Sequence, residues 1–431
     1  MNRSKSVSAF ILLALTFWTG GGVLCARDGI QAGPVVLEDL IEEALSVNPL
    51  VLAAENQWRA AMETIPQARA MPDPMLSYGH FFSSIETRLG PQRNKLSLSQ
   101  RLPFFGKLSL KERIAGEQAF VFEEQFLQAR LEVILQVKEA FYSLYWIDEA
   151  VAIAESEKDV LRRLATAARK KYAAGTAAQQ DALKAQLEIS KLTDRLLILG
   201  QGRRSAASQL NALLNRPPDT ELDPIRQTSI PALTSDPDSL LAQAREARPE
   251  LRRADRIIQK NSLHVELAKK NYWPDLNVMV DYFDIGSGST THPEDGRNAW
   301  MASVGINIPL WRGKLRAAEA EAAIRLKASQ DLRQDLHNNT SARIHELFTE
   351  IKMYEEQDRL YEHSLIPQAE QALRSAEIAY IAGKTDFLSI LDAERMLIQL
   401  KTAFAKLTSD RGKSIARLER IVGNEILEEG Q

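Results

Sequence analysis

The sequence has one cysteine, Cys25, among 431 residues, so a fold held together by disulfides within the chain is excluded. The formal net charge is only −3 at pH 7, and no basic footprint for nucleic acid is present. Neither a Walker-type phosphate loop nor a nucleophile-elbow motif occurs, and the histidines are scattered without metal-ligand spacing. We therefore expect no catalytic site, no cofactor and no metal centre.

The chain also lacks an apolar run of ~18 residues, so no membrane-spanning helix is expected. Its one apolar stretch near the N-terminus, residues 9–18, follows Arg3 and Lys5 and precedes three glycines. This order is typical of a secretory signal peptide, which we assign to residues 1–26. A lipid-modified Cys25 is the alternative. We favour ordinary cleavage, because Leu24 stands where lipoprotein signals usually carry a small residue.

The two halves of the chain carry the same motifs in the same order, about 200 residues apart. The repeated motifs are Pro72-Asp73 and Pro274-Asp275, Leu102-Pro-Phe-Phe-Gly-Lys107 and Ile308-Pro-Leu-Trp-Arg-Gly-Lys314, and Tyr172-Ala-Ala-Gly175 and Tyr380-Ile-Ala-Gly383. We therefore divide the exported chain into four parts. These are a first structural repeat (residues 35–215), a linker rich in proline and aspartate (216–238), a second repeat (239–423) and a C-terminal tail (424–431).

Each repeat contains two short stretches in which apolar and polar residues alternate. The alternating apolar sets are Leu96, Leu98 and Leu102; Leu276, Val278, Val280 and Tyr282; and Val304, Ile306, Ile308 and Leu310. Alternation predicts strands with one apolar face, and about 9–11 residues is the length that a tilted strand needs to cross a bilayer. From alternation alone, strands of an ordinary soluble hairpin sheet fit equally well.

Long helices are expected on either side of these strands. A helix should run from Val35 to about Pro66, and no proline occurs between Phe104 and Arg216. At 1.5 Å per residue, the segments 106–175 and 313–383 would each form about 100 Å of helix. Pro367 should kink the second of them. Shorter helices, 176–215 and 384–423, should return, which gives a layer of antiparallel helices without a compact core.

Four strands in one chain cannot close a transmembrane barrel, because the smallest have about 8 strands. Two copies would reach about 8 strands, whose interior is filled by side chains. Three copies would give about 12 strands, enough to enclose a lumen. The strand number therefore favours a trimer if a passage is required.

The element order, the duplication and the motifs resemble the TolC-like outer-membrane efflux proteins, and in particular their heavy-metal branch. The segment Ser99–Lys107 and the two Tyr-x-x-Gly turns carry the resemblance most specifically. It implies a mixed, mainly α fold: a trimeric transmembrane β-barrel of about 12 strands, four per chain, that continues into a long periplasmic α-helical barrel.

The resemblance also implies a function and partners. The chain would be an outer-membrane channel of a tripartite efflux system that passively conducts substrates, with transition-metal ions as the candidate. Its partners would be two further copies, a periplasmic adaptor (membrane fusion) protein and an inner-membrane pump of the resistance-nodulation-division (RND) type. A periplasmic coiled-coil adaptor or structural protein is the alternative.

Two glycine turns separate the long helices from the return helices. Gly175 and Gly383 are predicted to end their helices in the left-handed conformation, and Thr176 with Gln179 has the pattern of a capping box. The resemblance places both turns at the periplasmic tip, with Tyr172 and Tyr380 just before them. These turns need no function to explain them, because tight helical hairpins have the same pattern.

The resemblance carries two acidic positions over to this tip. Asp181 corresponds to an acidic residue linked to the gate, and Asp392 to an acidic constriction. The chain departs from the family where Lys384 and Thr385 stand in a turn that often has arginine, and where Ser389 replaces another pore aspartate. The alternative is that both aspartates are ordinary solvated helix charges.

Overall fold

The computed structural model describes residues 36–176, 178–225, 230–288 and 293–426. The predicted signal peptide, Cys25 and residues 427–431 of the predicted tail lie outside these ranges. Among the described residues, no helix has both the length and the apolar character needed to cross a membrane.

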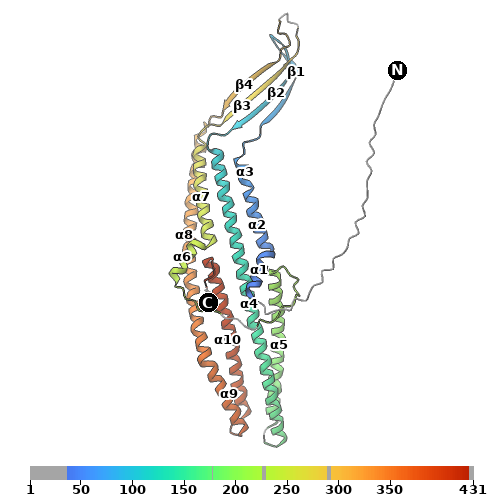
Figure 1. The fold of residues 1–431 in the computed structure, drawn as a ribbon, viewed down its shortest axis with the longest axis vertical. Coiled ribbons are helices and arrows are strands. Elements are labelled where there is room, and N and C mark those ends of the chain that lie inside the picture. Colours follow the sequence, from blue (N-terminus) through green and yellow to red (C-terminus); the bar gives the residue numbers. More distant parts are fainter. Residues whose placement is uncertain (1–35, 177, 226–229, 289–292, 427–431) are drawn as a thin grey trace, which may run out of the picture. The chain divides into compact units, whose positions relative to one another are not determined.

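Both halves of the described chain show the same order of elements (Figure 1): opening helices, two strands, a long helix and a return helix. The first half contains α1 (Leu37–Val47), α2 (Pro49–Met62), α3 (Thr64–Arg69), β1 (Met75–Thr87), β2 (Gly90–Leu102), α4 (Lys107–Ala173) and α5 (Gln179–Leu213). The second contains α6 (Pro237–Ala247), α7 (Pro249–Lys270), β3 (Leu276–Ile285), β4 (Ala299–Ile306), α8 (Arg312–Leu360), the π-helical segment η1 (Tyr361–Leu365), α9 (Ile366–Ile381) and α10 (Phe387–Val422). The exact limits of the two repeats and of the linker stay a prediction.

The predicted long helix of the first half is confirmed. Helix α4 has 67 residues, which at 1.5 Å per residue is about 100 Å. In the second half, the predicted helix 313–383 is interrupted by the π-helical segment η1, which separates α8 from α9 and ends two residues before Pro367. Proline has no N–H and its ring clashes with the carbonyl four residues earlier, so the regular α-helical ladder cannot continue unchanged through Pro367.

The single opening helix expected from Val35 to about Pro66 is wrong, because the structure divides it into three. Helix α2 begins with Pro49 in its first turn, and Asn48 caps it by accepting the Leu50 N–H at 2.9 Å. Proline fits the first turn of a helix but breaks the ladder of the helix before it. Asn48 also donates to the Leu213 carbonyl at 2.9 Å, which ties this break to the end of α5.

The strands form one antiparallel sheet in the order β1-β2-β3-β4. On one face, Leu98 lies opposite Val280, and Val280 opposite Ala302. On the other face, Ser97 lies opposite Asp281, which is fully buried, accepts a hydrogen bond from Ser97 Oγ and lies 3.1 Å from Lys95 Nζ. One face is therefore apolar and the other polar. Among the described residues, strands β1 and β4 are the edges of the sheet, and each pairs with one other strand.

The fourth strand is shorter than the alternation predicts. It ends at Ile306, so Ile308 and Leu310 lie outside it. Asn307 donates its backbone N–H to the Asp275 carbonyl at 3.2 Å, and its side chain accepts the Asp275 N–H. Pro309 has no N–H to continue the ladder, so the chain leaves the sheet here.

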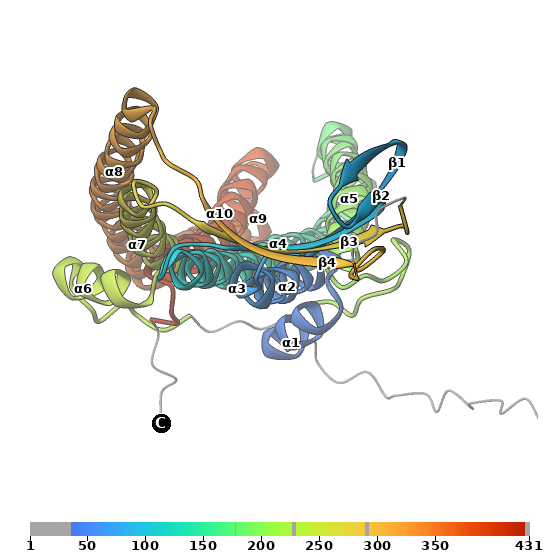
Figure 2. The same cartoon turned by 90° about the horizontal axis from the view of Figure 1, so that it is seen from above.

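Helix α4 is the central element of the helical part. It contacts α2 and α7 in its first part and α5 and α10 in its second. Seen from above (Figure 2), α4 and α10 lie between α7 and α8 on one side and α5 on the other. In the described part of the chain, three apolar clusters hold these helices together, and one of them joins α4, α5, α9 and α10 close to the two turns. The predicted layer of antiparallel helices is confirmed.

Candidate functional site

The two turns between α4 and α5 and between α9 and α10 have the same backbone. Gly175 has φ +73° and Gly383 has φ +72°, so both predicted left-handed ends are confirmed. The Thr176 N–H donates to the Lys171 carbonyl at 2.9 Å, and the Lys384 N–H donates to the Ala379 carbonyl at 2.8 Å. This bond to the fifth preceding residue is characteristic of a Schellman motif. We call the described residues of these turns, within 174–178 and 382–386, the tip.

The predicted capping box at the first turn is wrong. Helix α5 begins at Gln179 with no side-chain cap, and Thr176 Oγ1 donates instead to the Lys171 carbonyl at 3.0 Å. The second turn has a cap that the sequence reasoning missed. Asp386 accepts the Ser389 N–H at 3.0 Å and the Ser389 hydroxyl at 2.6 Å, and these bonds lower the pKa of Asp386. The sequence carries a signal for this cap, because Asp386 is a residue type preferred at helix N-caps and Ser389 follows it at the third position.

Lys171 at the end of α4 connects the two helical hairpins. Its Nζ donates to the Tyr380 carbonyl at 2.6 Å and lies 4.0 Å from the centre of the Tyr380 ring. Tyr380 is buried and packs on Phe387 with a ring separation of 5.6 Å. Burial, and then the charge of Asp181, raise the pKa of Tyr380. Asp181 and Tyr380 are therefore neighbours across the two hairpins.

The other predicted tip residues are on the surface. Tyr172 and Lys384 are exposed. Asp392 is also exposed and lies 3.3 Å from Arg395 Nη1, one turn further along α10. The structure thus brings together Asp181 and Tyr380 but not Tyr172, Lys384 and Asp392 within one chain.

A buried acidic pair, absent from the predicted site, lies deeper between the hairpins. Glu157 on α4 is 6% exposed, Glu394 on α10 is 4% exposed, and their carboxyl groups are hydrogen-bonded to each other. Burial raises the pKa of both groups, and the charge of Glu394 raises that of Glu157 further. Two neighbouring carboxylates cannot both ionise easily, so we expect the pair to share a proton.

The pair borders a cavity of about 180 Å³ between α4, α5 and α10. From α5, Glu188 accepts from Arg395 Nη2 at 2.5 Å and from Lys191 Nζ at 2.9 Å. Two of the nearby cations are therefore neutralised by Glu188 rather than by the pair. Glu157 lies between Ala154 and Leu161 on the buried face of α4. An acidic residue in an apolar stripe could have identified it from the sequence.

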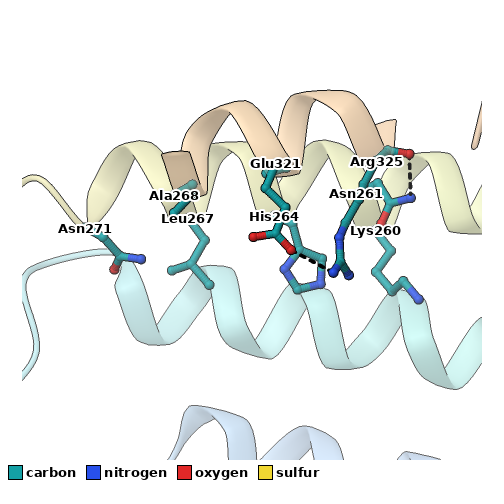
Figure 3. Close-up of a pocket in the computed structure, with 10 residues that line it drawn as sticks. Lys260, Asn261, His264, Leu267, Ala268, Asn271, Glu321 and Arg325 are labelled. Carbon is teal, nitrogen blue, oxygen red and sulfur yellow. Dashed lines mark hydrogen bonds and ion pairs between the residues drawn. The ribbon is translucent and has the colours of Figure 1, made fainter. Parts of the chain in front are cut away.

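A second hollow of about 300 Å³ lies between α7 and α8 (Figure 3). Arg325 Nη2 lies 2.7 Å from Glu321, and His264 and Lys260 also line it. Burial, followed by the charges of Lys260 and Arg325, lowers the pKa of His264. Among the described residues, no group of three or more His, Cys, Asp and Glu side chains is arranged to hold a metal ion.

A buried ion pair joins the sheet to the helices. Lys107 Nζ at the start of α4 lies 2.7 Å from Asp275 Oδ1, just before β3, and both side chains are less than a tenth exposed. Arg101 donates to Asp275 Oδ2 at 2.7 Å, and the Phe104 N–H donates to Oδ1 at 2.9 Å. Burial opposes ionisation of Asp275, but these bonds lower its pKa to about 2. Two of the repeated sequence motifs therefore meet in one structural junction.

These features define a class of protein: a protomer whose sheet has one apolar and one polar face, connected by long helices to paired glycine turns. The family model for outer membrane efflux proteins matches residues 40–216 and 240–424, and the chain belongs to this family. The predicted resemblance is thereby confirmed. The chain is an outer-membrane channel component of efflux systems with a periplasmic helical part, and the family supports this reading over the adaptor alternative.

Individual relatives span nearly the whole chain. The cobalt-zinc-cadmium resistance protein CzcC of Cupriavidus metallidurans is 26% identical over 396 residues, which are 91% of each chain. The outer membrane protein VceC of Vibrio cholerae has 21% identity and a TM-score of 0.75 over 91% of this chain and 97% of its own. CusC has 18% identity and a TM-score of 0.74 over 90% and 92%. At these identities the structural matches show the fold.

Proposed function

We propose that three copies of this chain form one passive channel for transition-metal ions, fed by a periplasmic adaptor and an inner-membrane pump of the RND type. Family members are the outer-membrane components of tripartite efflux pumps. In the proposed trimer, three four-stranded sheets close a barrel of about 12 strands, with the apolar face towards lipid and the polar face towards the lumen.

The observation that carries the metal assignment is the similarity to a protein named for cobalt, zinc and cadmium resistance over nine-tenths of both chains. No resident metal centre is needed for this function, because a channel that conducts ions releases them again. The energy comes from the pump. The two repeats, 35–215 and 239–423, would supply equivalent halves of each protomer, joined by the linker 216–238.

Deleting the gene tests the metal assignment. We expect the deletion strain to lose tolerance to at least one of cobalt, zinc, cadmium, copper and silver, and plasmid-borne wild type to restore it. Growth at graded concentrations of these salts, beside dyes and antibiotics, measures the effect. Sensitivity confined to organic compounds would refute metal export while leaving the channel function intact.

We further propose that the tip is the gate. Three copies each of Asp181 and Asp392 would converge around one axis, where confined like charges attract cations more strongly than the same charges on an open surface. The left-handed glycines let the hairpin ends move while α4 and α10 stay intact. Lys171 and Tyr380 hold the two hairpins of one chain together.

Two aspartate variants test the gate in planar bilayers. Asp392→Ala should lower the preference for cations, and the loss should shrink as salt screens the remaining charges. Asp181→Ala should raise resting conductance up to about fivefold, which corresponds to roughly 1 kcal/mol for one partly exposed charge interaction. Asp194→Ala is the matched control, because Asp194 is an exposed aspartate on the same helix but 13 residues away from Asp181. Unchanged conductance and selectivity in both variants would place the gate elsewhere.

A further inference from the structure

The junction motif is present twice, but one chain completes it only once. Asp275, which precedes β3, closes on Lys107, which follows β2, and β2 and β3 are neighbours in the sheet. The corresponding residues of the other motif copy are Asp73, which precedes β1, and Lys314, which follows β4. Strands β1 and β4 are the opposite edges of the sheet, so two strands separate these residues.

The aspartate and lysine of the second motif copy differ from those of the first in solvent exposure. Asp275 and Lys107 are both buried, whereas Asp73 and Lys314 are both exposed. Within the described parts of the chain, neither Asp73 nor Lys314 has an ion-pair or hydrogen-bond partner through its side chain. One protomer thus presents an unpaired carboxylate at one sheet edge and an unpaired ammonium at the other.

The apolar neighbours of the junction show the same contrast. Phe104 stacks on Trp273 with a ring separation of 5.2 Å and an angle of 11°. Their counterparts in the other motif copy are Leu310, which is 70% exposed, and Met71, which is 61% exposed. Large apolar side chains at both free ends of the sheet favour an additional contact that the isolated chain does not make.

We infer that Asp73 of one copy pairs with Lys314 of the next copy, so that each subunit boundary repeats the Asp275–Lys107 junction. This inference rests on the proposed trimer. It assigns a register to the pairing of β4 with β1 of the next copy. Because Gln100 lies opposite Val278 and Leu98 opposite Val280, Ile306 should lie opposite Leu76 and Val304 opposite Tyr78.

The side chains at these positions suit the pairing. Ile306, Leu76, Val304 and Tyr78 are each more than half exposed in one chain, so the pairing would cover an apolar stripe and close two strand edges. One difference is predicted. Asn307 stands where the first motif has Arg101, so the intersubunit junction has one cation fewer than the junction within the chain.

Charge reversal tests the pairing. Asp73→Lys and Lys314→Asp should each weaken the trimer in detergent. We expect the dissociation constant, measured by light scattering at decreasing protein concentration, to rise by at least about tenfold. The double variant should recover most of the loss, because the charges again attract. Lys111→Asp, an exposed lysine on the first turn of α4 beyond Lys107, is the matched control and should leave the trimer unchanged.

A disulfide tests the register independently. In a Cys25→Ser background, Ser77→Cys with Gly305→Cys should give intersubunit disulfides on a non-reducing gel, since Ser99 and Met279 are the paired counterparts within the chain. A Cβ at Gly305 has room, its nearest neighbour being 3.9 Å away. Ser77→Cys with Ser303→Cys, shifted by two residues, should not cross-link.

The outcomes separate the inference from the function on which it rests. A wild-type protein that is monomeric or dimeric would overturn the proposed trimer. A wild-type trimer that tolerates both single charge reversals, or that cross-links only through the shifted pair, would overturn the Asp73–Lys314 pairing alone.

Discussion

Replacing Asp275 with alanine is expected to destabilise the protein by about 3–5 kcal/mol, because it leaves a buried ammonium group without its partner. Lys107 is only 8% exposed, and its other acceptor is the Trp273 carbonyl at 2.9 Å. The variant would also leave the Phe104 N–H and the Arg101 guanidinium without this acceptor. Thermal unfolding of the purified protein in detergent, followed by circular dichroism, measures the loss.

Replacing both members of the ion pair, Lys107 and Asp275, provides the control. Lys107→Met combined with Asp275→Leu should be more stable than Asp275→Ala, because an apolar pair of similar volume avoids the unpaired charge. Asp219→Ala, an exposed aspartate, should be neutral. If Asp275→Ala unfolds like wild type, the junction is not a stabilising element.

The pH dependence of this junction follows from the direction in which the pKa of Asp275 is shifted. The pKa of Asp275 is lowered from 3.8 to about 2, so its contribution to stability is present above its unfolded-state value and is lost as the pH falls towards 2. The ion pair therefore stays intact over the neutral range.

The acidic pair Glu157–Glu394 should show the opposite pH dependence of stability. For a group whose pKa is raised by folding, the folded state binds the proton more tightly, so stability is full below the unfolded-state value of 4.5 and falls as the pH rises through the folded-state value. We therefore expect the contact between α4 and α10 to weaken as the pH rises. Each unit by which folding raises a pKa corresponds to about 1.4 kcal/mol, or a tenfold change in local opening.

The surrounding charges decide how far this effect extends. The groups that face the pair from the packed helices are Arg163 on α4, Glu188, Lys191 and Arg195 on α5, Glu377 on α9, and Arg395 and Lys401 on α10. The positive charge of Arg195 opposes the rise in the pKa of Glu157 without reversing it. Those of Lys401 and Arg163 do the same for Glu394. We therefore expect the pair to keep one shared proton to a higher pH than an isolated carboxyl group would.

Glu394→Gln tests this expectation, because an amide can donate to Glu157 at every pH. Hydrogen exchange of peptides that cover residues 150–170 and 385–400, corrected for the intrinsic pH dependence, should show faster opening of the wild-type helices at higher pH. The variant should show a flatter profile. Asp392→Asn, which changes an exposed carboxylate two residues away, is the matched control. Identical profiles for wild type and Glu394→Gln would exclude a shared proton.

Short-range patterns in the sequence were sufficient for most of the elements. The proline-free stretch after Phe104 predicts α4, alternation predicts β2 and β3, and the Tyr-x-x-Gly motifs predict the left-handed turns at Gly175 and Gly383. These features depend on backbone geometry and on which face of an element is apolar, and both are written within a few residues. The errors also have local causes. Pro49 divides the opening helix, and Asn307 with Pro309 ends β4 early.

Most of the helices and strands, the glycine turns, the duplication and the family of this protein can be predicted from local patterns in the sequence. Which charged residues meet depends on how distant segments pack. Lys107 and Asp275 are 168 residues apart, and Lys171 and Tyr380 are 209 apart. Glu157 meets Glu394 across two hairpins in the same way. Periodicity shows which face of a helix is buried, but the residue opposite depends on how two distant helices pack, and only that packing sets the partner and the pKa.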